Sequence, residues 1–193
     1  MRFTKKIGVV VLAGVVAAGS IAASAPQKAD AANVTAYLCF ASKSYGGVLS
    51  DHNDANRSKG VMNGNKLVSL KGITVKNATI KKGKFSVTVS ATGKNLKTFS
   101  SEKGWNSIYV DTSLAGKKKS SLKVTKAVLK MDGKTVKTIS NPALTPDPGK
   151  TDDFTQVMVL NGWNSYAQKK CKASSVTKMP TKSISVTITG TLK

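Results

Sequence analysis

Apolar and polar residues alternate along several short segments of this chain. The segment FSVTVS at Phe85–Ser90 and the first half of KSISVTITGTL at Lys182–Leu192 place an apolar residue at every second position. Successive side chains of a β-strand point to opposite faces, so both segments are predicted to be strands with one buried and one solvated face. Shorter apolar or β-branched runs predict further strands at Val34–Ala41, Ile73–Ile80, Ile108–Thr112, Lys123–Met131, Lys134–Ile139 and Phe154–Leu160.

Turn signals lie between these segments. Asp132-Gly133 separates two predicted strands and indicates a type I′ hairpin, and Lys81–Lys84 (KKGK) indicates a second hairpin loop. Gly116–Ser121 and the proline-bearing segment Asn141–Asp153 are predicted to be loops. Outside the N-terminal region, no segment has helical periodicity over more than two turns. We therefore expect an all-β fold, an antiparallel β-sandwich of jelly-roll type with its first and last strands close together.

The N-terminus has the order of a secretory signal peptide: a positive region with Arg2, Lys5 and Lys6, an apolar run, and small residues in A-x-A sites. We expect cleavage after Ala31, which leaves residues 32–193 as a single β-sandwich domain. A retained membrane anchor is the alternative, although the apolar run is just short of the ~20 residues that span a bilayer. No later stretch is apolar enough for stable membrane insertion, so the mature chain is expected to be secreted.

Lysine dominates the charge of the mature chain. The full sequence has a formal net charge of +22, and removal of residues 1–31 takes away four basic residues and one acidic residue, which leaves +19. Arg57 is then the only arginine. Lysine is a hydrated point charge, whereas arginine suits bidentate recognition of phosphates and base edges. The composition favours diffuse attraction to polyanions over sequence-specific nucleic-acid recognition, and a solubilising surface without a partner is the alternative.

Cys39 and Cys171 are the only cysteines, and they lie near opposite ends of the mature chain. In an exported protein they predict one intramolecular disulfide. The bond would close a loop of about 130 residues, which is worth roughly 4–5 kcal/mol in the chain-entropy model. In a strictly anaerobic host the pair would instead stay reduced.

The sequence offers little for catalysis. The mature chain has one glutamate, Glu102, and one histidine, His52, which lies in a polar segment without a nucleophile motif nearby. Asp152 and Asp153 are neighbours in sequence and would point to opposite faces of a strand, so they do not form the facing pair of acids that glycosidases use. We therefore expect no enzyme activity and no cofactor.

Calcium is the one metal for which the sequence suggests a site. Asp51, Asn53 and Asp54 place oxygen ligands close together within Ser42–Val68, a segment longer than an ordinary loop. The pattern loosely resembles a calcium loop, but Ala55 occupies its fifth position, and the glycine and distal glutamate of an EF-hand are missing. An Asx-rich turn is the alternative explanation.

The tetrapeptide GWNS occurs at Gly104–Ser107 and at Gly162–Ser165 and contains both tryptophans, but the flanking residues do not repeat. If both motifs reach the same end of the sandwich, aromatic rings there could stack on sugar faces while amides contact hydroxyls. The alternative is that the indoles cover the ends of the core. A predicted strand follows directly after Trp105, which favours this alternative for Trp105. The candidate ligand-binding residues are Trp163, Asn164, Tyr166, Trp105, Asn106 and Tyr45.

Four segments of the chain, AYLCFAS, GKFSVTVS, IYVDTS and SISVTITGTL, carry a resemblance to a known class of domain. They resemble small secreted jelly-roll domains of anaerobic Gram-positive bacteria, similar in shape to carbohydrate-binding modules. The resemblance spans most of residues 33–193. It implies a β-sandwich with a glycan or surface ligand, and it assigns no binding residue to this sequence.

These observations favour a secreted, monomeric, non-catalytic protein that binds a glycan or an anionic polymer of the cell wall or cell surface. Charge would then hold the protein at the wall. Two alternatives stay open. One is a structural or adhesive surface subunit, including a host-interaction factor, which would bind protein partners. The other is a cationic protein that acts on walls or membranes, whose retention at the wall would disappear in high salt.

Overall fold

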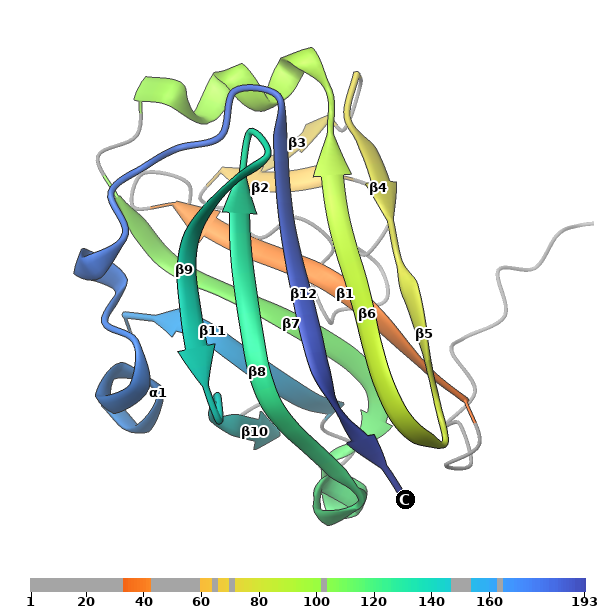
Figure 1. Cartoon of the computed structure of the whole chain (residues 1–193). Helices are drawn as coiled ribbons and strands as arrows, with labels where there is room; N and C mark the ends of the chain where they lie inside the picture. The colour runs from red at the N-terminus through yellow and green to blue at the C-terminus, as the bar shows by residue number, and fades with distance from the viewer. Residues whose placement is uncertain are drawn as a thin grey trace, which may run out of the picture.

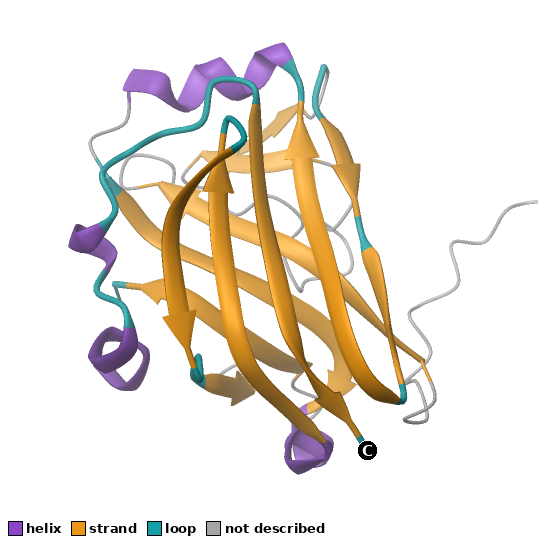
Figure 2. Cartoon of the chain, viewed as in Figure 1, coloured by secondary structure: helices purple, strands orange, loops and turns teal. Residues whose placement is uncertain are grey.

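The computed structural model describes residues 33–42, 60–63, 66–69, 72–101, 104–146, 154–162 and 165–193 of the chain. Most of these residues lie in β-strands, and two five-stranded antiparallel sheets form two layers that face one another (Figure 1). The strands of one layer cross those of the other at an angle, and short helical segments lie around the rim (Figure 2). The predicted all-β fold with antiparallel sheets is confirmed.

The first sheet contains, in spatial order, β10 (Leu144–Pro146), β11 (Phe154–Asn161), β7 (Trp105–Ala115), β1 (Asn33–Ser42) and β5 (Ala78–Lys81). The second contains β4 (Thr74–Lys76), β6 (Gly83–Thr92), β12 (Ser183–Leu192), β8 (Leu122–Met131) and β9 (Lys134–Ser140). A separate two-stranded sheet consists of β2 (Gly60–Asn63) and β3 (Lys66–Ser69). The helical segments are η1 (Lys94–Ser101), η2 (Gly116–Ser121), α1 (Ser165–Lys170) and η3 (Ala173–Ser175).

The hydrophobic core lies between the two large sheets. Along β1, every second residue from Val34 to Phe40 joins the core, and along β12 every second residue from Ile184 to Leu192 is buried. Residues of both sheets belong to the same buried cluster. Burial of each large aliphatic side chain is worth roughly 1.5–3 kcal/mol, so the alternation predicted from the sequence also supplies the contact that holds the layers together.

One predicted hairpin is only partly correct. The strand expected at Ile73–Ile80 is divided in two, and its halves join different sheets: β4 pairs with β6, whereas β5 pairs with β1. The chain therefore crosses from the second sheet to the first at Asn77 before it turns back into β6. Because it crosses, this one segment covers the edge of β6 and the edge of β1 with backbone hydrogen bonds.

The turn between β8 and β9 forms as predicted. Met131 pairs with Lys134, which leaves Asp132 and Gly133 as a two-residue loop. Their φ angles are 50° and 78°, both in the left-handed region that a type I′ turn requires. Aspartate and glycine tolerate this region better than other residues, so the sequence itself selects the turn.

The Asp132 carboxylate also anchors this turn to the start of β12. It accepts hydrogen bonds from the backbone N–H groups of Thr181 at 3.1 Å, Lys182 at 2.7 Å and Ser183 at 3.0 Å, and from the Thr181 hydroxyl at 3.1 Å. Desolvation by itself raises the pKa of Asp132, but these four donors stabilise the charged form more strongly and lower the pKa from 3.8 to about 2.

We expect Asp132→Asn to lower the free energy of unfolding by about 1–2 kcal/mol at pH 7, after allowance for solvent screening. Asparagine keeps the type I′ turn, so the change removes mainly the charge. The carboxylate is more acidic in the folded chain, so its contribution is complete above about pH 4 and is lost as the pH falls toward 2. Urea unfolding of the natural chain and of Asp132→Asn at pH 7 and at pH 2 measures this contribution. If the two proteins differed in free energy of unfolding as much at pH 2 as at pH 7, this account would be contradicted.

The predicted disulfide is not formed: Cys39 and Cys171 are both buried, and they are not bonded to each other. Cys39 lies on the outer face of β1 and packs with Tyr109 and Met158, whereas Cys171 belongs to the core between the sheets. The two sulfurs are thus in separate clusters. The first and last strands, expected to be close together, belong to different sheets and are not paired with each other.

Candidate functional site

The first GWNS motif lies beside the glycine that begins the second. The first motif begins β7 and the second follows the end of β11, and these strands pair with Ser107 opposite Asn161. The backbone N–H of Gly162 donates a hydrogen bond to the carbonyl oxygen of Asn106 at 2.6 Å. Gly162, the first residue of the second motif, therefore lies beside the first motif.

Trp105, however, faces the core. Its side chain is 1 % exposed, and its ring lies edge-on to Phe40 with the ring centroids 5.6 Å apart. The indole Nε1 donates a hydrogen bond to the carbonyl oxygen of Lys178 at 3.0 Å. Asn106 is half-buried, and its amide donates to the carbonyl oxygen of Ser42 at 3.0 Å. In this structure both residues connect strands and a loop, and the indole has no open face for a sugar ring.

The other candidates lie largely outside the described residues, namely Tyr45, Trp163, Asn164 and the calcium candidates Asp51, Asn53 and Asp54. Tyr166 belongs to α1, but only its backbone is described. The aromatic cleft and the calcium site therefore stay predictions. Among the described residues, no group of three or more His, Cys, Asp or Glu side chains could hold a metal ion. Within the same residues, no helix has the length and apolar character needed to cross a membrane.

A different surface stands out on the outer face of the second sheet. Hydroxyl-bearing residues of β6 lie directly opposite those of β12, and we call these four pairs the hydroxyl ladder: Ser86–Thr189, Thr88–Thr187, Ser90–Ser185 and Thr92–Ser183. The hydroxyls of Thr88 and Thr187 are hydrogen-bonded at 2.7 Å, and those of Ser86 and Thr189 at 3.2 Å. Such cross-strand pairs stabilise the sheet while they leave polar groups in contact with water.

Lysines border the ladder on both sides. Thr191 of β12 lies between Lys84 of β6 and Lys123 of β8, and further along β8 Lys126 and Lys130 lie beside ladder residues. Neighbouring strands are about 4.8 Å apart, so these lysines stand within about 5–10 Å of the ladder at the backbone. Lys76 of β4 lies opposite Ser90 on the other side. All are exposed, and we call the five of them the border lysines: Lys76, Lys84, Lys123, Lys126 and Lys130.

The second sheet carries no opposing charge. The sequences of its five strands contain no Asp or Glu, and their only aromatic residue, Phe85, is buried. Only two of the residues that the structure describes are acidic. Of these, Asp111 is fully buried and Asp132 is bound by the start of β12. The outer face therefore carries positive charge with no carboxylate on its strands, and its side chains are mainly polar, with Val128 opposite Thr187 as an apolar exception.

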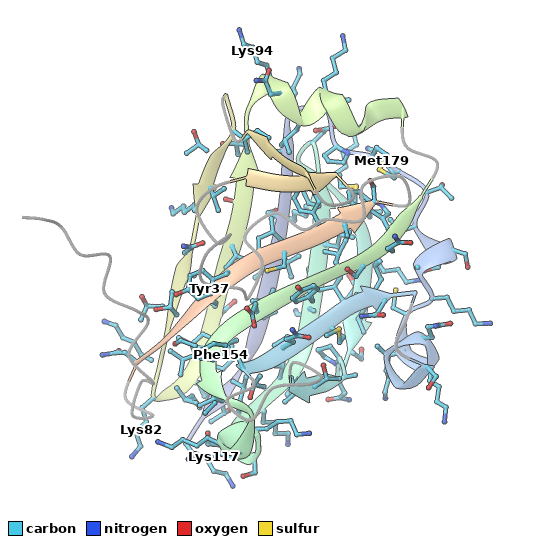
Figure 3. The ribbon with its side chains drawn as sticks, turned by 180° about the vertical axis from the view of Figure 1, so that it is seen from behind. Tyr37, Lys82, Lys94, Lys117, Phe154 and Met179 are labelled. Atoms are coloured by element: carbon cyan, nitrogen blue, oxygen red, sulfur yellow. The ribbon has the colours of Figure 1, made fainter. Side chains whose placement is uncertain are left out.

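The density of lysines increases toward one end of the ladder. Lys84 and Lys123 are the border lysines at that end. Further lysines lie just before each of them in the sequence, in the turn before β6 and in η2. Figure 3 shows Lys82, in the turn between β5 and β6, and Lys117, the first of three consecutive lysines in η2, at the same end of the molecule. Lys94 lies at the opposite end.

Sequence patterns alone did not predict this surface, although they contain a signal for it. The alternation of β6 and β12 predicts a wet face of Ser and Thr on each strand, but the two strands are about a hundred residues apart, as the separation of 99 between Thr88 and Thr187 shows. Periodicity does not tell which strands become neighbours. The ladder exists only because β6 and β12 pair in this register.

Comparison of the chain with protein-family models, with curated proteins and with solved structures finds no match. The resemblance of its strand segments to secreted jelly-roll domains therefore stays a prediction. A function for the chain has to be argued from the residues on its surface.

Proposed function

We propose that the chain is a secreted, non-catalytic protein that binds an anionic polymer of the cell surface, and that the outer face of the second sheet is its binding surface. The observation that carries this proposal is the absence of any acid from the five strands of a sheet whose outer face has five exposed lysines. A polyanion gains attraction to every lysine there and meets no carboxylate on the five strands. The screening length is about 8 Å at physiological ionic strength, so neighbouring lysines act together.

The chemistry of this face also selects among the ligands considered from the sequence. Neutral sugars bind proteins largely by stacking on exposed aromatic rings, and the outer face of this sheet offers none. Arginine, which reads base edges, is absent from the residues that the structure describes. Lysine and hydroxyl groups instead suit a flexible anionic chain that is held by its charges.

The finer fold assignment belongs with this proposal. We propose a jelly-roll type of sandwich because β5, β6, β7 and β8 alternate between the two sheets, as successive strands of a jelly roll do. Such wrapping places long strands side by side from distant parts of the chain, which is how β6 and β12 come to share one face.

The test is a matched pair of charge variants. Lys84→Gln, Lys123→Gln, Lys126→Gln and Lys130→Gln together are expected to abolish most binding to an immobilised polyanion. They should also reduce the salt slope of log K by roughly 3, at about 0.7 for each phosphate that a lysine no longer neutralises. The control removes the same charge from exposed lysines elsewhere, Lys94, Lys97, Lys169 and Lys170. Equal loss of affinity in both variants would mean that net charge, and not this face, attracts the polymer.

A further inference from the structure

We infer that the ligand of this face is a linear phosphodiester polymer of an acyclic polyol, and that it lies along the hydroxyl ladder, parallel to β6 and β12. The inference rests on the proposed function and names its ligand. It depends on the order of the side chains across the sheet: lysines on the outside, hydroxyl pairs in the middle.

The direction of the polymer follows from where the lysines stand. Along β8, Lys123, Lys126 and Lys130 form one row beside the ladder, and Lys84 adds a fourth charge at the crowded end. A polymer that crossed the strands would meet at most two border lysines, for example Lys76 and Lys130, before it reached the edge of the sheet. A polymer parallel to the strands remains within reach of the whole row.

The hydroxyl pairs supply donors between the charges. In the Thr88–Thr187 pair, one hydroxyl donates to the other, and the accepting hydroxyl keeps its own proton for a ligand. The same holds for Ser86 and Thr189. Side chains that point to one face recur every second residue, so the pairs repeat at about 6.8 Å along the ladder. The face therefore offers a regular row of neutral donors flanked by ammonium groups.

A phosphodiester fits this arrangement better than a carboxylate on a sugar ring. It carries one negative charge shared by two non-bridging oxygens that point in different directions, so one oxygen can accept from a hydroxyl while the other faces a lysine; serine, threonine and lysine are common phosphate contacts. In a polyol phosphate the charge lies in the chain itself. A uronate chain would have to lay its rings on the ladder, where no aromatic side chain is present to stack on them.

The experiment compares poly(glycerol phosphate) with polygalacturonate of equal charge by titration calorimetry. We expect the natural chain to bind the phosphate polymer about tenfold more tightly. The double variant Thr88→Val, Thr187→Val keeps every charge and the β-branched shape, and we expect it to lose that preference while its affinity for polygalacturonate is unchanged. Thr135→Val with Thr138→Val, on the exposed side of β9, is the control and should keep the preference.

The outcomes separate this inference from the proposed function. If the four lysine changes in the second sheet remove binding but Thr88→Val, Thr187→Val retains the tenfold preference, the ladder does not select the ligand and only the inference fails. If the natural chain binds both polymers equally, the inference also fails. If oligo(dT) of equal charge binds as tightly as poly(glycerol phosphate) or more tightly, nucleic acid is the better ligand and the inference is overturned. Near-native circular dichroism of each variant confirms that it is folded.

Discussion

Trp105→Ala is expected to lower the free energy of unfolding by about 3–5 kcal/mol, the usual range for removal of a fully buried tryptophan. The indole is 1 % exposed and fills the end of the core against Phe40. Its removal also leaves the carbonyl oxygen of Lys178 without the Nε1–H donor. Domains of this size are typically stable by 5–15 kcal/mol, so this decrease is a large fraction of the total. Urea denaturation followed by circular dichroism measures it.

The matched control is Trp105→Phe. Phenylalanine keeps an aromatic ring against Phe40 and cannot make the hydrogen bond to Lys178, so we expect a smaller decrease of about 1–2 kcal/mol. Trp105 belongs to β7 of the first sheet and its buried side chain is not part of the outer face of the second sheet, so the affinity of the folded variants for a polyanion should be unchanged. A Trp105→Ala variant with native stability and weakened binding would reverse the assignment and place the indole in a ligand site.

Sequence patterns predicted the strands well because strand formation in this chain is a local property. β12 alternates as its sequence requires, and Asp132-Gly133 makes the turn that its residue types favour. The division of Ile73–Ile80 between two sheets was not predictable in this way. Which partner a strand takes depends on chain segments far away in the sequence, and hydrophobic alternation is the same for either partner.

The candidate site was also not predictable from local sequence patterns. GWNS drew attention because it contains both tryptophans, yet the described indole is used for packing. Lysine indicated only a diffuse attraction to polyanions, and serine and threonine indicated no site, since each is ordinary on a solvated strand face. Their significance comes from register: Thr88 meets Thr187, and Lys84 and Lys123 flank Thr191. A disulfide between Cys39 and Cys171 failed as a prediction for a related reason, because spacing in sequence does not reveal on which face of a sheet a cysteine lies.

Gly190→Ala is expected to destabilise the fold by the upper part of the ~1–3 kcal/mol typical of overpacking, or by more. Gly190 lies in β12 at an irregularity in its pairing with β8. A Cβ atom at this position would overlap the backbone carbonyl oxygen of Lys123 and lie 2.9 Å from Cζ of Phe85. A backbone oxygen cannot rotate away as a side chain can, so β8 must separate from β12.

The same separation would reach the proposed binding face. Lys123 is the border lysine whose carbonyl is displaced; it stands opposite Thr191, and Lys84 lies on the other side of Thr191. We therefore expect folded Gly190→Ala to bind poly(glycerol phosphate) more weakly than the natural chain, in addition to unfolding at a lower urea concentration. Gly162→Ala is the control, because its Cβ would lie 3.1 Å from the carbonyl oxygen of Asn106, far from this face, and a shift of a few tenths of an ångström relieves the contact.

Phe85→Leu in the Gly190→Ala background identifies the obstacle. It removes the ring atom near the new methyl group but leaves the Lys123 carbonyl in place, so a double-mutant cycle should show little recovery of stability. Recovery of most of the stability would instead identify the Phe85 ring as the obstacle. The contact between position 190 and the Lys123 carbonyl would then not be the cause of the destabilisation. In that case the binding of the double variant should also return, because Lys123 would again stand opposite Lys84 across Thr191.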